Sequence, residues 1–306
     1  MEFAIGGTAA MAACLFTNPL EVLKTRMQLQ GELKAKGHAV HYKNVFHAGY
    51  VVAKNEGVLA LQKGLVPGLW VQLFLNGARL GVYGVADSSG YLKDEKGDVR
   101  FFRTLTIVGA GAMLGNYLAS PLFLVKTQLQ SQANKAIAVG HQHKITGTFQ
   151  ALIDIYKANG VKGLFRGSLS TLPRAFVGGS TQLLFFDYTK QFLNKFNVTE
   201  SPLLKSFIAS MVGGVGISVM MNPFDLIMTR LYNQPIDASG KGLLYHSYFD
   251  CVKKIIKSEG VLAFYKGIGP TYFRLGPHTV LCLVFFDELR NLVDKYLPHE
   301  KKIQNV

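Results

Sequence analysis

Three arginines lie inside long stretches of apolar residues: Arg79 in 67–86, Arg174 in 171–186 and Arg274 in 270–286. None of these stretches contains Asp or Glu. A guanidinium buried among apolar residues costs free energy, so it normally faces protein or water and has a function. Its planar N–H groups bind carboxylate and sulfate through two parallel hydrogen bonds. The three arginines therefore indicate a site for a small dianion.

Further polar residues accompany these arginines. Gln72, Asn76 and Arg79 are spaced i, i+4 and i+7, which places them on one face of a helix. His278 follows Arg274 by one helical turn. Together they predict a cationic cavity lined by hydrogen-bonding groups. For His278, packing between helices is the alternative and the more common role of a lone histidine.

A repeat explains the length of the chain. The segments NPLEVLKTRMQLQ, SPLFLVKTQLQSQ and NPFDLIMTRLYNQ begin at Asn18, Ser120 and Asn222, and their prolines are 102 residues apart in a chain of 306. A basic residue and a glycine recur at a matching position in each copy, as Lys63 and Gly64, Arg166 and Gly167, and Lys266 and Gly267. We predict three copies of one unit, at 1–100, 101–202 and 203–306.

Each copy contains two long apolar stretches, and the first of them is long enough to cross a bilayer. The first stretches are 3–20, 104–125 and 206–224, with 18, 22 and 19 residues, and the arginine-containing stretches are the second. Polar segments with helical spacing of apolar residues lie between them, at 42–56, 147–159 and 248–259. The sequence predicts an all-α membrane protein with six transmembrane helices, three short interfacial helices, and a kink at the proline that ends each first stretch.

Composition and charge narrow the classes of function. Lys and Arg number 33 against 19 Asp and Glu, a net charge of +14. A nucleic-acid-binding protein would explain this charge but not the uncharged stretches, so no nucleic-acid partner is expected. The loops 26–63, 126–166 and 230–266 hold six basic residues each, which favours them as the inner side. No motif of a hydrolase, a metalloprotease or a phosphate-binding loop is present, and three distant cysteines indicate neither a metal nor a disulfide.

The repeated pattern Pro-x-acid-x-x-base-x-base, complete in copy one as Pro19, Glu21, Lys24 and Arg26, resembles the mitochondrial carrier family, solute carrier family 25. The base-Gly markers fit the same resemblance, which covers essentially the whole chain. It implies a three-fold pseudosymmetric barrel of six tilted helices, with three short helices on the matrix side. It also implies a multi-pass protein of the mitochondrial inner membrane, acting as a monomer by alternating access. Stretches 74–84 and 273–286 are similar to carriers of oxaloacetate and sulfate.

The resemblance implies a matrix gate in which the acid of each copy pairs with the first base of the next. Glu21 would pair with Lys126, and Asp225 with Lys24. At the third position Phe123 would face Met228, so an apolar contact replaces an ion pair. The residue nine beyond each proline corresponds to the hydrogen-bonding brace of the family: Gln28, Gln130 and Tyr232. The alternative for these three is an ordinary polar residue on the last turn of a helix.

A second gate is implied at the opposite, cytoplasmic side. Its residues are Asp187 and Lys190 in copy two and Asp287 and Arg290 in copy three, whereas copy one has Asp87 where the base belongs. Only Asp187 with Arg290 forms a complete pair. We therefore expect the cytoplasmic gate to be the weaker one.

The basic residue and glycine of each copy are implied to bind lipid, which in this family is cardiolipin: Lys63, Gly64, Arg166, Gly167, Lys266 and Gly267. Anionic head groups bind at basic pockets on the inner side of membranes and at helix amino termini. The alternative is that these residues only follow the positive-inside rule.

The arginines and the resemblance together predict an antiporter, not an enzyme, without a cofactor. Its substrates would be small dianions such as dicarboxylates, oxaloacetate-like oxoacids, sulfate or other sulfur oxyanions. An uncoupling-type leak of protons or anions is the alternative on the same fold, and a weak cytoplasmic gate favours it. For the arginines, the alternative to substrate binding is that each pairs with a gate acid or reaches the membrane surface.

Overall fold

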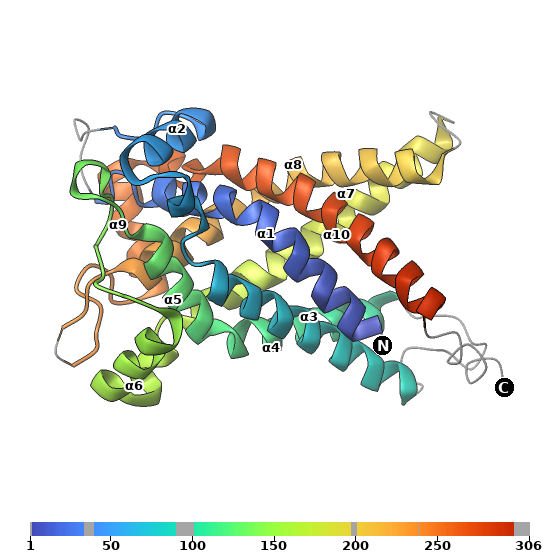
Figure 1. The fold of residues 1–306 in the computed structure, drawn as a ribbon, viewed down its shortest axis with the longest axis horizontal. Helices are drawn as coiled ribbons and strands as arrows, with labels where there is room; N and C mark the ends of the chain where they lie inside the picture. Colours follow the sequence, from blue (N-terminus) through green and yellow to red (C-terminus); the bar gives the residue numbers. More distant parts are fainter. Residues whose placement is uncertain (1, 34–39, 90–100, 197–200, 238, 297–306) are drawn as a thin grey trace.

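The computed structural model of the protein describes residues 2–33, 40–89, 101–196, 201–237 and 239–296 (Figure 1). The described side chains do not include those of Asn76, Arg79, Asp87, Asp187 and Lys190. The roles predicted for these five residues depend on side chains outside the described ones.

Long helices form from the apolar stretches: α1 (Glu2–Leu29), α3 (Leu65–Ser88), α4 (Phe101–Leu118), α5 (Ser120–Ser131), α7 (Thr171–Lys195), α8 (Pro202–Asn233) and α10 (Ile268–Tyr296). Five of them, α1, α3, α7, α8 and α10, are longer than the stretches that predicted them, because polar residues continue the helical pattern at the ends. The other two, α4 and α5, divide the stretch 104–125 between them. Apart from one isolated bridge between Ile236 and Gly242, the described residues contain no β structure.

Apart from α5, each of these helices packs against the next one along the sequence. α1 contacts α3, α3 contacts α4, α4 contacts α7, α7 contacts α8, and α8 contacts α10. The last of them, α10, packs along α1, so the contacts return to the first helix. Residues on the inner faces of all these helices can therefore meet around one centre.

Short helices gather at one end of the molecule: α2 (Val45–Glu56), α6 (Thr148–Leu164) and α9 (Tyr248–Glu259) (Figure 1). α1 begins at the opposite end. The N-cap side chains of Asn44 and Ser247 accept hydrogen bonds from the backbone N–H groups of His47 and Asp250, which fixes where α2 and α9 begin. We call this end of the molecule the short-helix end.

Short 3₁₀ turns connect these helices to the long ones: η1 (Val58–Gln62), η3 (Ser168–Ser170) and η4 (Val261–Tyr265), with η2 (Lys135–Ile137) in the loop after α5. Apolar clusters hold the short-helix end together. Val45, Ala48 and Val52 of α2 pack on Leu23 and Leu29 of α1. A second cluster joins α8 to α9 in the same manner.

The three repeat prolines have different effects on their helices. Pro19 and Pro223 lie inside the uninterrupted helices α1 and α8. Pro121 instead stands in the first turn of α5, and the helix is interrupted at Ala119. The missing N–H of a proline is tolerated without loss in the first turn of a helix, which favours a new helix start there. The predicted stretch 104–125 is therefore divided between α4 and α5.

Two helical segments among the described residues are long and apolar enough to cross a membrane, Val58–Leu75 and Phe207–Asn233. The six transmembrane helices stay a prediction.

Candidate functional site

A small cavity lies between the long helices, close to the short-helix end. Its volume is about 60 Å³. Its lining brings together ten residues that the sequence predicts for the substrate site and the matrix gate: Gln72, Arg174, Arg274, Glu21, Lys24, Lys126, Asp225, Phe123, Met228 and Gln130. A water molecule needs at least about 10–15 Å³ of such space, so the cavity has room for a few waters.

Glu21 of α1 is shared by two cations from two other helices. Lys126 of α5 forms an ion pair with its Oε2, and Arg274 of α10 donates from Nε to its Oε1 at 2.6 Å. The Glu21 side chain is 8% exposed. A carboxylate this buried is stable in its charged form only with such partners. Glu21 therefore joins α1 to α5 and α10 at once.

Asp225 of α8 has the same arrangement. Lys24 of α1 pairs with its Oδ2, and Arg174 of α7 donates from Nε to its Oδ1 at 2.5 Å. Its side chain is 1% exposed. We call the six charged side chains the gate cluster: Glu21, Lys24, Lys126, Arg174, Asp225 and Arg274. Four positive and two negative side chains give the gate cluster a formal charge of +2.

The two arginines use only part of their hydrogen-bonding capacity on these acids. Each binds its carboxylate through Nε. Arg174 also donates from Nη1 to the side-chain oxygen of Asn116 at 3.2 Å. Among the described residues, Nη2 of Arg174 and both terminal nitrogens of Arg274 bind no other group. Both arginines therefore pair with a gate acid through Nε, as the alternative interpretation of the sequence expects. Nη2 of Arg174 and the two terminal nitrogens of Arg274 remain available for an anion.

The third gate position is apolar. Phe123 and Met228 are each 6% exposed and belong to one hydrophobic cluster with Tyr232. The guanidinium of Arg174 lies over the Phe123 ring, 5.5 Å from its centroid. Such a contact between a cation and a ring face is attractive. Phe123 therefore contacts the Arg174 guanidinium as well as the apolar cluster.

This arrangement leads to a prediction for the two apolar gate residues. Met228→Lys adds a fifth cation to the gate cluster and is expected to lower the thermal stability strongly. Phe123→Asp is expected to cost less, because the new carboxylate lies beside Arg174. Combined, the two changes create a third ion pair, so a double-mutant cycle on unfolding should show a coupling of about 0.5–3 kcal/mol. Additive effects would contradict the facing arrangement.

The predicted brace residues bind across helices. Gln130 accepts a hydrogen bond from Thr25 Oγ1 at 2.9 Å and donates from Nε2 to Asn18 at 3.3 Å and to Glu21 at 3.5 Å. Gln28 accepts from Thr229 Oγ1 at 2.8 Å. Tyr232 forms a hydrogen bond with Ser120, with 2.9 Å between the two hydroxyl oxygens. All three are buried, unlike an ordinary polar residue at an exposed helix end.

The glycines of the base-Gly markers lie directly against these brace residues. A Cβ on Gly64 would stand 2.9 Å from Cγ of Gln130, and one on Gly267 would stand 3.0 Å from Cγ of Gln28. Both glycines also have positive φ, 73° and 83°. The close approach and the left-handed backbone together explain why glycine follows the base.

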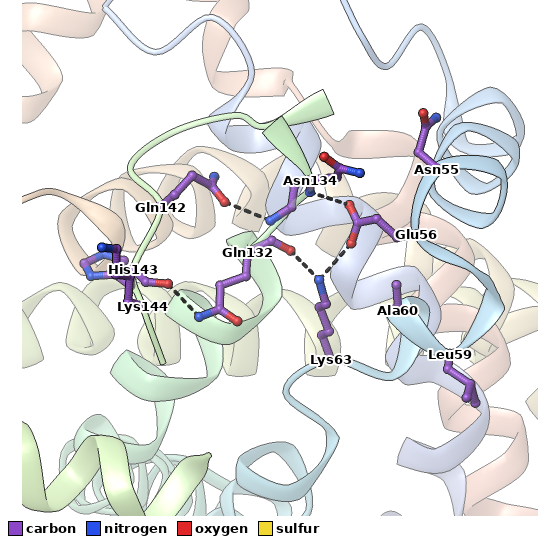
Figure 2. A pocket seen from close by; sticks show the side chains of 11 residues that line it. Asn55, Glu56, Leu59, Ala60, Lys63, Gln132, Asn134, Gln142, His143 and Lys144 are labelled. Atoms are coloured by element: carbon purple, nitrogen blue, oxygen red, sulfur yellow. Dashed lines mark hydrogen bonds and ion pairs between the residues drawn. The ribbon is translucent and has the colours of Figure 1, made fainter. Parts of the chain in front are cut away.

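Lys63 and Lys266 point to carboxylates near the ends of α2 and α9. Lys63 pairs with Glu56 at 2.7 Å, and Lys266 pairs with Glu259 at 2.6 Å. Figure 2 shows Glu56 between Lys63 and the backbone N–H of Asn134. The lysine donors also reach backbone carbonyls of the neighbouring copy, Gln132 and Gln30 respectively. These lysines therefore tie the copies together, and whether they also bind lipid stays a prediction.

The same two carboxylates each receive an arginine that the sequence predictions missed. Arg26 donates two hydrogen bonds to Glu56, at 2.7 and 3.0 Å, and Arg230 donates two to Glu259, at 2.5 and 2.9 Å. Arg26 and Arg230 are completely buried. Two sequence features could have predicted these pairs. They are the second base of the repeat pattern and a glutamate directly before a glycine, and both occur in copies one and three only.

Copy two lacks both partners. Gln128 stands where the arginine belongs and Asn159 where the glutamate belongs. Accordingly Arg166, the counterpart of Lys63, has no side-chain hydrogen bond or ion pair to any described residue, and its Nε is buried. Burial lowers the pKa of this guanidinium. The short helix α6 is therefore held to α5 without the charged clamp that the other copies have.

Glu32 lies just beyond α1 at the short-helix end. The Tyr245 hydroxyl donates to its Oε1 at 3.1 Å. Burial raises the pKa of Glu32 to about 7, and the neighbouring Glu259 adds to the effect while Arg230 opposes it. Glu32 thus titrates near neutral pH.

This shift predicts how stability depends on pH. An acid with a raised pKa in the folded state holds its proton more tightly when folded, so the free energy of unfolding falls as pH rises from about 4.5 to about 7. Glu32→Gln removes this cost, so the variant should unfold at a higher temperature than the wild type near pH 8 and at a similar one near pH 5. Identical melting temperatures across that range would contradict the assignment.

The remaining predicted residues lie at different places. Gln72 lines the cavity. His278 binds Thr17 of α1, with 3.1 Å between Nδ1 and Oγ1, and lies outside the cavity lining, which fits the packing alternative. Asp287 and Arg290 are exposed on α10, and Asp187, the predicted partner of Arg290, lies outside the described side chains.

Comparison with known proteins identifies the family of the chain. The sequence profile of the family described as mitochondrial carrier protein matches residues 1–89, 97–197 and 199–297. The chain belongs to the mitochondrial carrier family, whose members are transporters and not enzymes, as the sequence predicted.

Individual relatives match over nearly their whole length. The chain is 50% identical to human solute carrier family 25 member 35 over 95% of this chain and 98% of the relative. It is 41% identical to the mitochondrial oxaloacetate transport protein of Saccharomyces cerevisiae, over 95% of this chain and 89% of the relative. Mitochondrial citrate transporter E of Aspergillus niger is 36% identical, over 98% and 97%. The protein is therefore a metabolite carrier of the mitochondrion.

Proposed function

We propose that this carrier is an antiporter of the mitochondrial inner membrane that exchanges small dianions through the cavity between its long helices. The observation that carries the proposal is the formal charge of +2 on the gate cluster. Charge that is removed from water needs a compensating partner, and a dianion supplies two negative charges. A neutral or cationic substrate would leave the cluster unbalanced.

The arginine geometry supports the class of substrate. Arg174 and Arg274 are anchored through Nε, which leaves terminal N–H groups for the two anionic ends of a ligand. Two relatives are named for oxaloacetate and citrate. Fully ionised citrate carries three negative charges, one more than the cluster balances. We therefore propose dicarboxylates, oxaloacetate-like oxoacids, sulfate or other sulfur oxyanions as substrates.

The same cluster supports exchange rather than leak. We take the short-helix end as the matrix side, where Lys24 and Lys126 close the gate by pairing with Asp225 and Glu21. Opening the gate separates these pairs, and an unpaired buried charge costs several kcal/mol. A bound dianion provides substitute partners for the released lysines. The gate should therefore open readily when a dianion is bound and rarely when the cavity is empty.

The setting in the membrane belongs to the proposal as well. A multi-pass monomer with six membrane-spanning helices in three pseudosymmetric repeats explains why the helices contact one another in sequence and why the last contacts the first. Cardiolipin remains the proposed lipid at the base-Gly positions. Arg166 supports it best, because its guanidinium is not neutralised by any described residue.

Uptake into liposomes tests the proposed function. The purified carrier is reconstituted, and uptake of labelled oxaloacetate, malonate, sulfate and thiosulfate is measured into liposomes loaded with the same unlabelled anion or with none. We expect rapid uptake of at least one dianion into loaded liposomes only. Equal uptake into empty liposomes would favour a leak, and uptake of none of them would contradict the substrate class.

A further inference from the structure

Asn116 on α4 lies beside the gate cluster without being one of its charged members. It is 6% exposed, and α4 contains none of the residues that the sequence predicts for the substrate site or the gates. Its Nδ2 donates to the carbonyl of Ala112, one turn earlier, at 2.7 Å. Since the amide nitrogen is occupied in this way, the side-chain oxygen faces Nη1 of Arg174 at 3.2 Å. The amide can act only as an acceptor toward the arginine.

Arg174 is therefore held from three directions. Asp225 binds its Nε, Asn116 binds its Nη1, and Phe123 covers a face of the guanidinium. Arg274 has a single hydrogen-bond partner among the described residues, Glu21. The two anion-binding arginines thus differ in how firmly they are fixed, although both are similarly buried.

The corresponding positions in the other copies carry no such group. Counting five residues back from each repeat proline gives Cys14, Asn116 and Ser218. Ser218 is 1% exposed, and its hydroxyl donates to the carbonyl of Gly214 in its own helix. Cys14 has a thiol, which is a weak hydrogen-bonding group. Only the middle copy has an amide here, and of these three side chains only Asn116 accepts a hydrogen bond from an arginine.

We propose that Asn116 is a positioning residue that sets the valence of the transported anion. Its neutral oxygen orients Arg174 without neutralising it, so that this arginine forms a fixed subsite for one end of a dianion while Arg274 forms an adjustable subsite for the other. A carboxylate at the same place would orient Arg174 equally well but would consume its charge. The inference rests on the proposed function and adds a residue that selects for the charge of the substrate.

The test compares three variants in liposome exchange: Asn116→Asp, Asn116→Ala and the matched control Ser218→Ala. Asn116→Asp lowers the formal charge of the cluster from +2 to +1, so the KM for a dianion should rise roughly tenfold or more, as expected when a buried charge contact is lost. The same variant should gain on a monoanion of equal size, such as malonamate relative to malonate. Asn116→Ala should raise the KM for malonate several-fold with little change in kcat, and Ser218→Ala should leave both unchanged.

Thermal unfolding of each purified variant shows whether a changed KM comes from the position of Arg174 or from a loss of folded protein. Wild-type exchange of a dianion is measured first, because its absence would overturn the proposed function itself. If the wild type exchanges dianions and Asn116→Asp does so with an unchanged KM and no gain on malonamate, the role of Asn116 is overturned. The same conclusion follows if Asn116→Ala lowers only kcat and does so to the same degree as Ser218→Ala, since that pattern reflects helix packing alone.

Discussion

Replacing Arg174 or Arg274 by alanine is expected to abolish dianion exchange and to leave the protein folded. Each arginine offers terminal N–H groups to the substrate, and losing a desolvated charge contact costs about 2–5 kcal/mol, or more than tenfold in affinity. Folding is spared because each acid keeps one cation: Glu21 keeps Lys126, and Asp225 keeps Lys24.

Exchange in liposomes and thermal unfolding in detergent check this expectation together. Arg174→Lys and Arg274→Lys are the matched controls, since they keep the charge but not the planar pair of donors. They should retain partial exchange, between the alanine variants and the wild type. Near wild-type exchange by either alanine variant would remove that arginine from the substrate site.

Neutralising a gate acid should have the largest effect on stability. Glu21→Gln leaves Lys126 and Arg274 without a carboxylate, and Asp225→Asn does the same to Lys24 and Arg174. Removing one partner of a buried ion pair costs about 3–5 kcal/mol, because the other charge remains buried and unpaired. Here two cations are affected each time, so the variants should melt far below the wild type.

Replacing the lysines provides the contrast. Lys126→Met and Lys24→Met leave each acid with its arginine, so these variants should lose much less stability than the acid variants. The comparison is made by thermal unfolding of purified protein at one pH and salt concentration. If the acid and lysine variants melt at the same temperature, the acids are not shared in the way that the structure indicates.

The helices could be predicted from the sequence because apolar stretches of sufficient length leave few alternatives. The break at Ala119 could not, although all three copies carry the same proline. A proline removes one hydrogen bond and crowds the preceding turn, but the surrounding packing decides whether the helix continues or restarts. Pro19 and Pro223 stay inside continuous helices, whereas Pro121 begins a new one.

The site shows a similar division. The apolar stretches around Arg174 and Arg274 marked both arginines for the substrate site, and the pairs of Lys24 with Asp225 and Lys126 with Glu21 followed from the resemblance. The sharing of each acid between a lysine and an arginine depends on contacts between helices that are far apart in the chain. Asn116 was missed because an isolated polar residue in an apolar stretch has no periodic partner to mark it.

The most direct test of whether the gate cluster selects dianions is competition between anions of matched size and different charge. Exchange of labelled malonate is measured in the presence of unlabelled malonate, a dianion, or malonamate, its singly charged amide. A site with a formal charge of +2 predicts that malonate competes at least about tenfold better than malonamate, because the amide forfeits one charge-assisted contact. Equal competition by the two anions would contradict the claim that the gate cluster selects dianions.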